Sequence, residues 1–376
     1  MNTDNAYLKT RIRREIFPAG KRVLLISDLH GHAEGLKSLL KQASFCEDDI
    51  LVIVGDLVEK GPEILETVRY VMQLCEKYTV YPVMGNVDSG RLQGIYSDDP
   101  EVHRRLIAYA LYARRWWGNS LHEEMYRECG FSVDEEHDVG AALKVLRERF
   151  AKELAFLKSL PTILETQDMI FAHGGIPHER LEELEGTPSH LLMKRDRFMD
   201  EGLSFDKYVA VGHWPVALYS KDRPCCDPVI DHRRRIISLD GGCGVRSDGQ
   251  LNLVILPQGD VHRAEWLTWD PLPKIVALEH QEASETSVYF PWDEDPVEVL
   301  ERGDGMARIR REGREYSVPE AFLWESDGRT YCSNYTDYRV QANPGDRLSL
   351  VLTAPCGCYV KKNGVTGWYT GKYQTE

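Results

Sequence analysis

Residues 22–27 read Arg-Val-Leu-Leu-Ile-Ser, and the triplet Asp28-Leu29-His30 follows directly. A short apolar run of this kind is typical of a buried strand. Two side chains separated by one residue point to the same side of an extended chain. The stretch therefore predicts a buried strand that delivers Asp28 and His30 together at its carboxyl end.

The same arrangement recurs at two later runs. Residues 50–55 read Ile-Leu-Val-Ile-Val-Gly and precede Asp56, and a third apolar run over 79–84 ends at Gly85-Asn86. Between the runs, apolar residues recur at the spacing of amphipathic helices. This alternation predicts an open α/β sheet. Ligands bind such sheets at the carboxyl ends of the strands, where Asp56 and Asn86 are expected to join Asp28.

Two histidines stand in the same context further along the chain. His173 follows an apolar run that ends at Ala172, His213 follows one that ends at Val211, and a glycine adjoins each histidine. Glycine lets the backbone turn sharply and approach an ion. One such residue alone is more often a turn or helix cap, but the repeated pattern in a fixed order indicates a shared site.

The side chains of this set indicate metal binding. A bridging carboxylate with a mixture of Asp, His and Asn ligands suits manganese, iron or zinc, whereas magnesium and calcium prefer sites made of oxygen alone. Two ions about 3.5–4 Å apart can activate a water and stabilise charge on a phosphoryl group. We therefore expect two divalent metal ions, with manganese first and iron or zinc as alternatives.

The composition changes along the chain in a way that predicts separate parts. Residues 97–160 are rich in Leu, Ala, Arg and Glu at helical spacing and predict a helical insertion. A stretch rich in Pro and Glu over 271–290 predicts a linker, and residues 291–376 combine strand-like runs with glycine turns. We expect a domain over residues 1–270 that carries the metal centre, then the linker, then a small β-barrel.

Charge and hydropathy exclude several classes of protein. The 376 residues include 60 acidic and 46 basic side chains, a formal net charge of −14, which argues against broad nucleic-acid binding. No run approaches the ~20 apolar residues of a membrane span, and the start of the chain lacks a secretory signal. We expect a cytoplasmic protein without a membrane partner, whose nine cysteines are mostly reduced.

The ordered motifs resemble those of the calcineurin-like metallophosphoesterase superfamily, and the likeness covers roughly residues 20–257. They are Asp28-Leu29-His30, Gly55-Asp56, Gly85-Asn86, His173-Gly174 and Gly212-His213. Residues 55–62 and the segment Asp240-Gly241-Gly242 are most similar to phosphoprotein phosphatases and their bacterial relatives, which include symmetric diadenosine tetraphosphate hydrolases. The resemblance implies a sandwich of two mixed β-sheets flanked by helices.

The resemblance also implies a ligand set. It places Asp28, His30 and Asp56 on one ion, and Asp56, Asn86, His173 and His213 on the other. Asp56 is then the bridge. Direct attack on phosphorus by a hydroxide held between the ions is the mechanism that the family likeness implies.

Two positions depart from the family pattern. Glu59-Lys60 stands where phosphoprotein phosphatases have Asp-Arg. Lys60 would therefore contact phosphate through a single ammonium group, without the two-pronged hydrogen bonds of an arginine. Val87 stands where they have the histidine that protonates the leaving group, and the Val87 side chain cannot donate a proton. Losing such an acid costs about 10²–10⁴ in rate when the leaving group is poor.

Other residues are predicted to supply what these departures remove. Asp88, or alternatively His32, would replace the missing acid. Arg195, in a segment similar to the bacterial relatives, would be a second cation on the phosphate, unless it pairs with a nearby aspartate. Glu59 and Asp240 would support the ligands, and Asp240 would orient His213.

The predicted activity is that of a serine/threonine protein phosphatase with a phosphoprotein substrate. The first alternative is a hydrolase of dinucleoside polyphosphates, because a good leaving group would tolerate Val87. The second is a catalytically weakened phosphate-binding or regulatory protein. The predicted barrel resembles bacterial Src-homology-3-like domains around Gly345-Asp346 and Trp368-Tyr369, and we expect it to dock on the rest of the chain or to bind a peptide.

Overall fold

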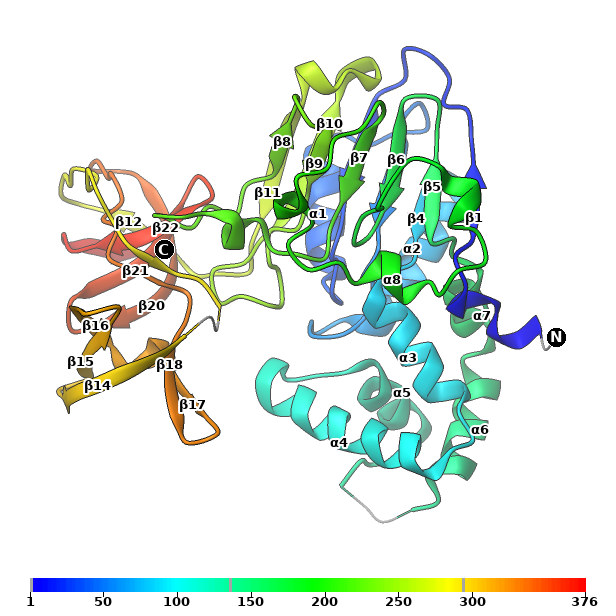
Figure 1. Cartoon of the computed structure of the whole chain (residues 1–376), viewed down its shortest axis with the longest axis horizontal. Coiled ribbons are helices and arrows are strands. Elements are labelled where there is room, and N and C mark those ends of the chain that lie inside the picture. Colours follow the sequence, from blue (N-terminus) through cyan, green and yellow to red (C-terminus); the bar gives the residue numbers. More distant parts are fainter. Residues whose placement is uncertain (1–2, 135–136, 293–294) are drawn as a thin grey trace. The chain divides into compact units, whose positions relative to one another are not determined.

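The computed structural model describes residues 3–134, 137–292 and 295–376. The chain divides into two compact units, whose elements are labelled in Figure 1. The N-terminal unit holds Met1–Pro215, Pro228–Val245 and Gln250–Trp269. The C-terminal unit holds Val216–Asp227, Arg246–Gly249 and Asp270–Glu376, so it includes two segments from the middle of the chain.

The first sheet of the N-terminal unit has the strand order β11-β10-β2-β3-β4. Its members are β2 (Val23–Ile26), β3 (Ile50–Val54), β4 (Thr79–Val83), β10 (Leu251–Leu256) and β11 (Glu265–Trp269). Strands β2, β3 and β4 run parallel, and β10 runs antiparallel to β2. Every residue of β2 and β3 is buried, as expected for strands covered on both faces. Helices α1 (Ala33–Gln42) and α2 (Ile64–Lys77) pack on this sheet.

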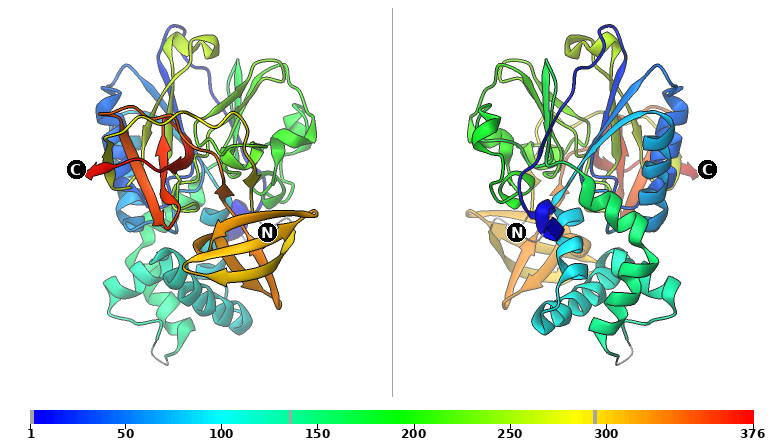
Figure 2. Two further views of the ribbon diagram at one scale, coloured as in Figure 1. Left: turned by 90° about the vertical axis from the view of Figure 1, so that its left-hand side faces the viewer. Right: turned by 90° about the vertical axis from the view of Figure 1, so that its right-hand side faces the viewer.

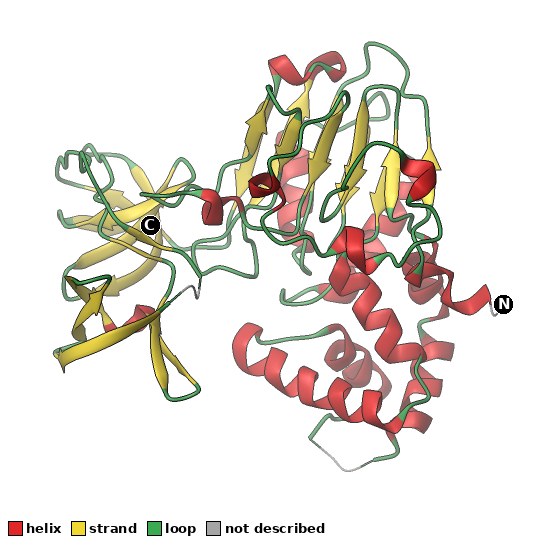
Figure 3. Ribbon diagram, viewed as in Figure 1, coloured by secondary structure: helices red, strands yellow, loops and turns green. Residues whose placement is uncertain are grey.

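The second sheet has the order β1-β5-β6-β7-β9-β8. Its members are β1 (Ile12–Arg14), β5 (Ile163–Glu165), β6 (Met169–Ala172), β7 (Tyr208–Val211), β8 (Val229–Asp231) and β9 (Ile236–Ser238). Side chains of both sheets, such as Val52 and Phe171, share one apolar core, and Figure 3 shows the two sets of strands in yellow. The predicted sandwich of two mixed sheets is confirmed.

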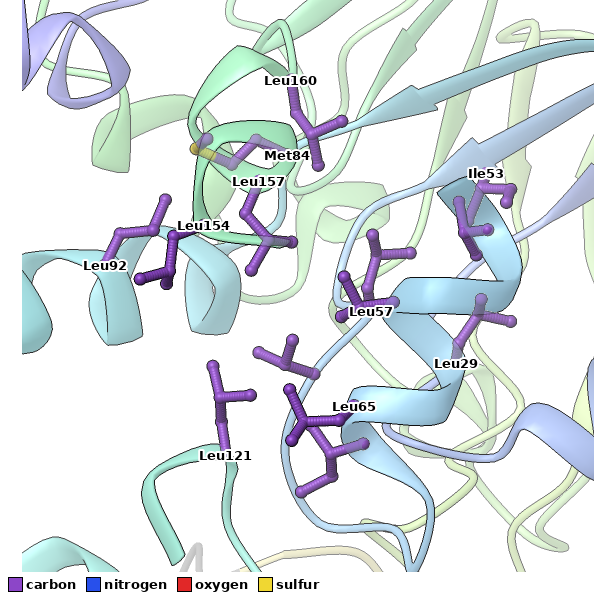
Figure 4. Packing of buried hydrophobic residues seen from close by; sticks show 14 of the residues in the cluster. Leu29, Ile53, Leu57, Leu65, Met84, Leu92, Leu121, Leu154, Leu157 and Leu160 are labelled. Atoms are coloured by element: carbon purple, nitrogen blue, oxygen red, sulfur yellow. The ribbon is translucent and has the colours of Figure 1, made fainter. Parts of the chain in front are cut away.

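Helices make up most of the described residues between 86 and 159. They are α3 (Asn86–Tyr96), α4 (Pro100–Trp117), α5 (Leu121–Cys129), α6 (Val139–Arg149) and α7 (Ala151–Ser159). Figure 2 shows them gathered at one end of the two sheets. Leu92, Leu121 and Leu154 pack in the same cluster as Leu57 and Leu65, as Figure 4 shows. The insertion therefore shares its core with the loop after β3.

Short helices make up the remaining elements. They are α8 (His190–Met193) and the 3₁₀ helices Thr3–Leu8, Leu181–Glu183, Phe198–Glu201, Val216–Tyr219, Pro257–Gly259, Val261–Arg263 and Glu320–Phe322. Among the described residues, no helix combines the length and the apolar character needed to cross a bilayer.

The C-terminal unit consists mainly of strands. One sheet has the order β22-β21-β20-β12-β23, a second β16-β15-β14-β18-β17, and β13 pairs with β19. The members are β12 (Lys274–Ala277), β13 (Tyr289–Phe290), β14 (Pro296–Gly303), β15 (Met306–Arg311), β16 (Arg314–Pro319), β17 (Leu323–Ser326), β18 (Arg329–Cys332), β19 (Tyr335–Thr336), β20 (Arg347–Ala354), β21 (Gly357–Lys362), β22 (Val365–Tyr369) and β23 (Tyr373–Thr375).

Two details differ from the sequence-based expectation for this unit. The described strands form separate sheets with free edges rather than a closed barrel. Residues 271–290, predicted to be a linker, contain β12, which pairs with β20 on one side and β23 on the other. Pro271 and Pro273, just before β12, and the glutamates after it gave this segment its linker-like composition.

Candidate metal centre

The predicted ligands lie where strands end and the backbone turns abruptly. Asp28, His30, Asp56 and His213 all have positive φ, between 40° and 67°. Residues other than glycine rarely adopt this conformation, and it is commonly found at functional sites. Asn86 opens helix α3, directly after β4. These turns bring side chains from β2, β3, β4, β6 and β7 to one place.

Four of the predicted ligands form a buried cluster, and a fifth, the partly buried Asn86, adjoins it. Asp28, Asp56 and His173 each offer one ligand atom within 4.8 Å of the others. The His30 Nε2 atom lies 3.8 Å from a carboxylate oxygen of Asp28 and 3.8 Å from one of Asp56. The Asn86 Oδ1 atom lies 3.0 Å from the His173 Nε2 atom.

Hydrogen bonds fix how two of the histidine rings face this cluster. The Nδ1 atom of His30 donates to the Val58 carbonyl at 3.1 Å, and the Nδ1 atom of His173 donates to the Val54 carbonyl at 2.9 Å. Because Nδ1 is occupied in both rings, Nε2 is the atom that turns toward the carboxylates. A metal-binding histidine usually holds its second nitrogen in this way, so the donor set fits a divalent ion.

The charges in the cluster also favour a bound cation. Burial, together with Asp240 and Asp56, raises the pKa of Asp28 well above its usual value. Burial opposes charge on His173, but Asp56 and Asp28 raise the pKa of His173 to about 10. Carboxylates buried side by side repel one another, and they attract a positive charge into the site. A divalent cation would supply that charge.

His213 adjoins the cluster in a different way. Its backbone amide donates to the Asp28 carboxylate at 3.1 Å, and its ring lies edge-on to the ring of His173 with centroids 5.4 Å apart. The His213 Nε2 atom pairs with Asp196 Oδ1 at 2.8 Å. Only Nδ1 therefore remains for a metal ion. Sequence reasoning treated Asp196 only as a partner for Arg195 and missed this contact.

The two predicted phosphate-binding cations are placed differently. The Lys60 Nζ atom donates to His30 Nε2 at 3.1 Å and lies 5.7 Å from the centre of the Trp117 ring, so this cation reaches the cluster. Arg195 forms an ion pair with Glu201 instead. In the described part of the chain, Arg195 has no contact with a predicted metal ligand.

Asp88, predicted to replace the missing acid, is buried and fully engaged with the backbone. Its Oδ1 atom accepts from the amides of Leu57 at 3.0 Å and Val58 at 3.2 Å, and its Oδ2 atom accepts from Gly85 at 2.9 Å. Burial, with Asp56 nearby, raises the pKa of Asp88 to about 7. This geometry favours a positioning role, because the carboxylate joins the two ligand loops.

The two residues predicted to support the ligands act on other partners. Glu59 Oε1 accepts from the Leu121 amide at 3.2 Å and lies 3.9 Å from Arg91 Nε, so Glu59 connects its loop to the insertion. Asp240 Oδ1 accepts from the Gly242 amide at 2.7 Å, and no bond from Asp240 to His213 occurs among the described residues. The Asp28 carboxylate, rather than Asp240, holds the His213 backbone.

Glu124 is a residue that sequence reasoning missed. Its Oε1 atom accepts from the Ile64 amide at 3.1 Å and its Oε2 atom accepts from the Leu65 amide at 2.7 Å, so it caps helix α2 from helix α5. Asn119 donates to the same carboxylate at 2.7 Å. The capped residues precede Glu124 by about sixty positions, so no local pattern could have revealed the contact.

We expect Glu124→Ala to lower the free energy of unfolding by about 2–3 kcal/mol, because two buried amides lose their acceptor. Glu128→Ala is the matched control on the same helix. Glu128 forms only a partly exposed pair with Arg69, so its loss should cost at most about 1 kcal/mol. Urea unfolding followed by circular dichroism measures both. Equal losses in the two variants would show that Glu124 is not a cap.

Comparison with known proteins supplies an independent finding. The family model for calcineurin-like phosphoesterases matches residues 21–242. The chain is 45% identical over 267 residues to the symmetrical bis(5'-nucleosyl)-tetraphosphatase of Vibrio cholerae serotype O1, over 68% of this chain and 80% of that protein. It is 42% identical over 78 residues to the protein of the same name from Psychromonas ingrahamii, an alignment that spans only 28% of that protein.

Solved structures give a weaker likeness. A protein serine/threonine phosphatase from Saccharomyces cerevisiae is 12% identical with a TM-score of 0.40, over 74% of this chain and 88% of that one. A metallophosphoesterase from Sphaerobacter thermophilus is 18% identical with a TM-score of 0.34, over 67% of this chain and 89% of that one.

Proposed function

This chain belongs to the calcineurin-like phosphoesterase family of phosphoester hydrolases, and on that premise we propose that its substrate is a dinucleoside polyphosphate. The observation that carries the proposal is Val87, which follows Asn86. Phosphoprotein phosphatases have at this position a histidine that acts as the general acid. The names of the relatives from Vibrio cholerae and Psychromonas ingrahamii support the same substrate class.

Leaving-group chemistry connects Val87 to this substrate. A serine alkoxide is strongly basic and must be protonated as it departs, whereas a nucleotide phosphate departs as a stable anion. The Val87 side chain packs against the apolar core, and both oxygens of Asp88 accept backbone amides. His32, the other predicted substitute, directs Nδ1 to the Leu29 carbonyl and its ring edge to Trp269. An anhydride substrate removes the need for an acid here.

We assign two divalent ions, with manganese first, to the cluster. Asp28, His30 and Asp56 would hold one ion, and Asp56, Asn86, His173 and His213 the other. Such a pair supplies positive charge on the phosphoryl oxygens and makes a water acidic at neutral pH. Lys60, already 3.1 Å from His30 Nε2, would then turn its ammonium group to a substrate phosphate.

A cavity beside Asn86 offers a place for one half of the substrate. It measures about 410 Å³ and is lined by Asn86, Ser89, Gln93, His190 and Lys194. Its volume lies in the range of small-molecule sites. Lys194 is exposed, and no ion pair engages it among the described residues. In this proposal Lys194, rather than the neighbouring Arg195, contacts the phosphate chain.

A serine/threonine protein phosphatase remains the second candidate, because residues 55–62 resemble that group most. The two candidates differ in the leaving group that they must expel. A phosphoserine peptide and a dinucleoside tetraphosphate therefore separate them.

The test is a panel of three substrates, an aryl phosphate, a phosphoserine peptide and diadenosine tetraphosphate, with the protein loaded with manganese. We expect kcat/KM for the dinucleotide to exceed that for the peptide by at least about 100-fold, from the missing acid. Val87→His should raise peptide hydrolysis about 10–100-fold and leave dinucleotide hydrolysis nearly unchanged. Val87→Leu is the apolar control and should change neither. A wild-type protein whose kcat/KM for the peptide equals that for the dinucleotide contradicts the proposal.

A further inference from the structure

A second cavity lies between helices α3 and α4, which pack against each other (Figure 1). It measures about 430 Å³, within the range of small-molecule sites. Gly90, Arg91 and Gln93 line it from α3, and Arg105 and Tyr109 line it from α4. We propose that this cavity binds the nucleobase at one end of the substrate. The inference rests on the proposed substrate class and adds the residues that would recognise the base.

The new cavity adjoins the one already assigned to half of the substrate. Gly90 and Gln93 line both, so the two cavities meet along α3. Asn86, a predicted metal ligand, opens this helix, and Gly94 in the second cavity follows eight residues later. Eight residues of helix span about 12 Å, a length that two phosphates and a ribose bridge when extended. A nucleotide with its reacting phosphate at the metal centre can therefore place its base between α3 and α4.

Gly90 leaves the passage between the two cavities open. A Cβ atom added at this helical position would meet no packed neighbour within 4 Å in the described part of the chain. A Cβ atom added at Gly94 would instead lie 2.6 Å from Leu106 Cδ1. Glycine weakens a helix interior relative to alanine, and packing does not require it at Gly90. Room for a ligand is a reason for glycine that packing does not supply.

Arg91 and Tyr109 form one wall of the cavity. The Arg91 guanidinium carbon lies 3.8 Å from the centre of the Tyr109 ring, so the cation covers the face of the ring. The buried Glu59 carboxylate adjoins both side chains. It lies 3.9 Å from Arg91 Nε and, together with burial, raises the pKa of Tyr109. Because nucleobases stack on aromatic rings and on arginine guanidinium planes, this pair is already in place to stack a base.

Two exposed side chains add hydrogen-bonding groups at the cavity. Gln93 and Arg105 line it from opposite helices. Amide and guanidinium groups are the usual partners of the donors and acceptors on a purine edge. Arg105 lies 3.7 Å from Glu101, an exposed pair of the kind that contributes little, so a ligand can replace it. The cavity therefore offers a stacking wall and polar groups for the edge of the same base.

The test compares three variants of the full-length protein loaded with manganese. A phenyl group in Gly90→Phe fills the passage, so KM for diadenosine tetraphosphate should rise about 10-fold or more, the effect of losing one stacked base. KM for an aryl phosphate, which has no nucleobase, is the internal reference. Arg105→Glu should raise KM for the dinucleotide about 5-fold, through loss of a charged hydrogen bond. Arg104→Glu is the control, because Arg104 also pairs with Glu101 but does not line this cavity.

Calorimetry with ADP separates this inference from the proposed function. We expect wild-type protein to bind ADP, and both Gly90→Phe and Arg105→Glu to bind it more weakly. Arg105 is exposed, so its variant keeps the inference testable if circular dichroism shows that Gly90→Phe folds poorly. Folded variants with wild-type ADP affinity and wild-type KM for the dinucleotide overturn the inference alone. Wild-type protein that binds ADP without cleaving the dinucleotide overturns the proposed function alone, and protein that does neither overturns both.

Discussion

Asp56→Asn is expected to reduce hydrolysis of every phosphoester by about 10³-fold or more and to remove tight manganese binding. The Asp56 carboxylate lies 3.3 Å from His173 Nε2 and 3.8 Å from His30 Nε2, so it adjoins histidines assigned to both ions. It also accepts the Val87 amide at 3.1 Å. A neutral amide in its place removes the negative charge that two cations would share.

The matched control is Asp49→Asn. Asp49 is also buried and lies before the amino end of β3, whereas Asp56 follows its carboxyl end. It pairs with Arg22 at 2.6 Å, so its replacement should cost stability without changing manganese stoichiometry or kcat. Metal content by mass spectrometry and initial rates on an aryl phosphate measure both variants. An Asp56→Asn protein that holds two ions and works within 10-fold of wild type would exclude Asp56 as the bridge.

The core of the fold was predictable because its signal is local. Strands β2 and β3 are buried at every position, so their sequences are continuous apolar runs, and each run ends in a polar residue at the same sheet edge. The positions of Asp28, His30 and Asp56 follow from that pattern. Their convergence with His173, more than a hundred residues later, required the order of the motifs as well.

Contacts between residues far apart in the sequence could not be predicted from local sequence patterns. Glu124 caps a helix that begins sixty residues earlier, and Glu59 bonds to the Leu121 amide; both look like ordinary acidic residues in the sequence. Likewise, alternation in residues 291–376 predicts strands, but it does not specify which strands pair. A barrel and a set of separate sheets therefore have the same local signature.

Adjacent cations illustrate the same limit on a smaller scale. Lys194 and Arg195 are neighbours, and only the side-chain direction at the end of α8 determines which one reaches the cavity beside Asn86. The structure gives that position to Lys194 and pairs Arg195 with Glu201. Side-chain chemistry favours arginine for phosphate contacts, so sequence reasoning chose Arg195, and its phosphate contact stays a prediction.

Asp88→Ala is expected to lower the free energy of unfolding by about 3–6 kcal/mol, because three buried amides lose their acceptor together. The amides belong to Leu57, Val58 and Gly85, which lie in the loops that carry Asp56 and Asn86. Urea unfolding measures the loss. Asp99→Asn is the control, since Asp99 is an exposed cap of α4 and asparagine caps helices equally well.

Kinetics with the milder Asp88→Asn variant separate a positioning residue from a catalytic acid. If Asp88 positions the loops, rates on the aryl phosphate, the phosphoserine peptide and the dinucleotide should fall by a similar factor, and manganese affinity should fall with them. An acid would instead be needed only for the poor leaving group, so only the peptide rate would drop, by about 10²-fold or more. Three amide donors on one carboxylate favour the first result, because the O–H group of a protonated Asp88 would face a backbone N–H group that is also a donor. A selective loss on the peptide with unchanged manganese affinity would restore Asp88 as the acid and would weaken the case for an anhydride substrate.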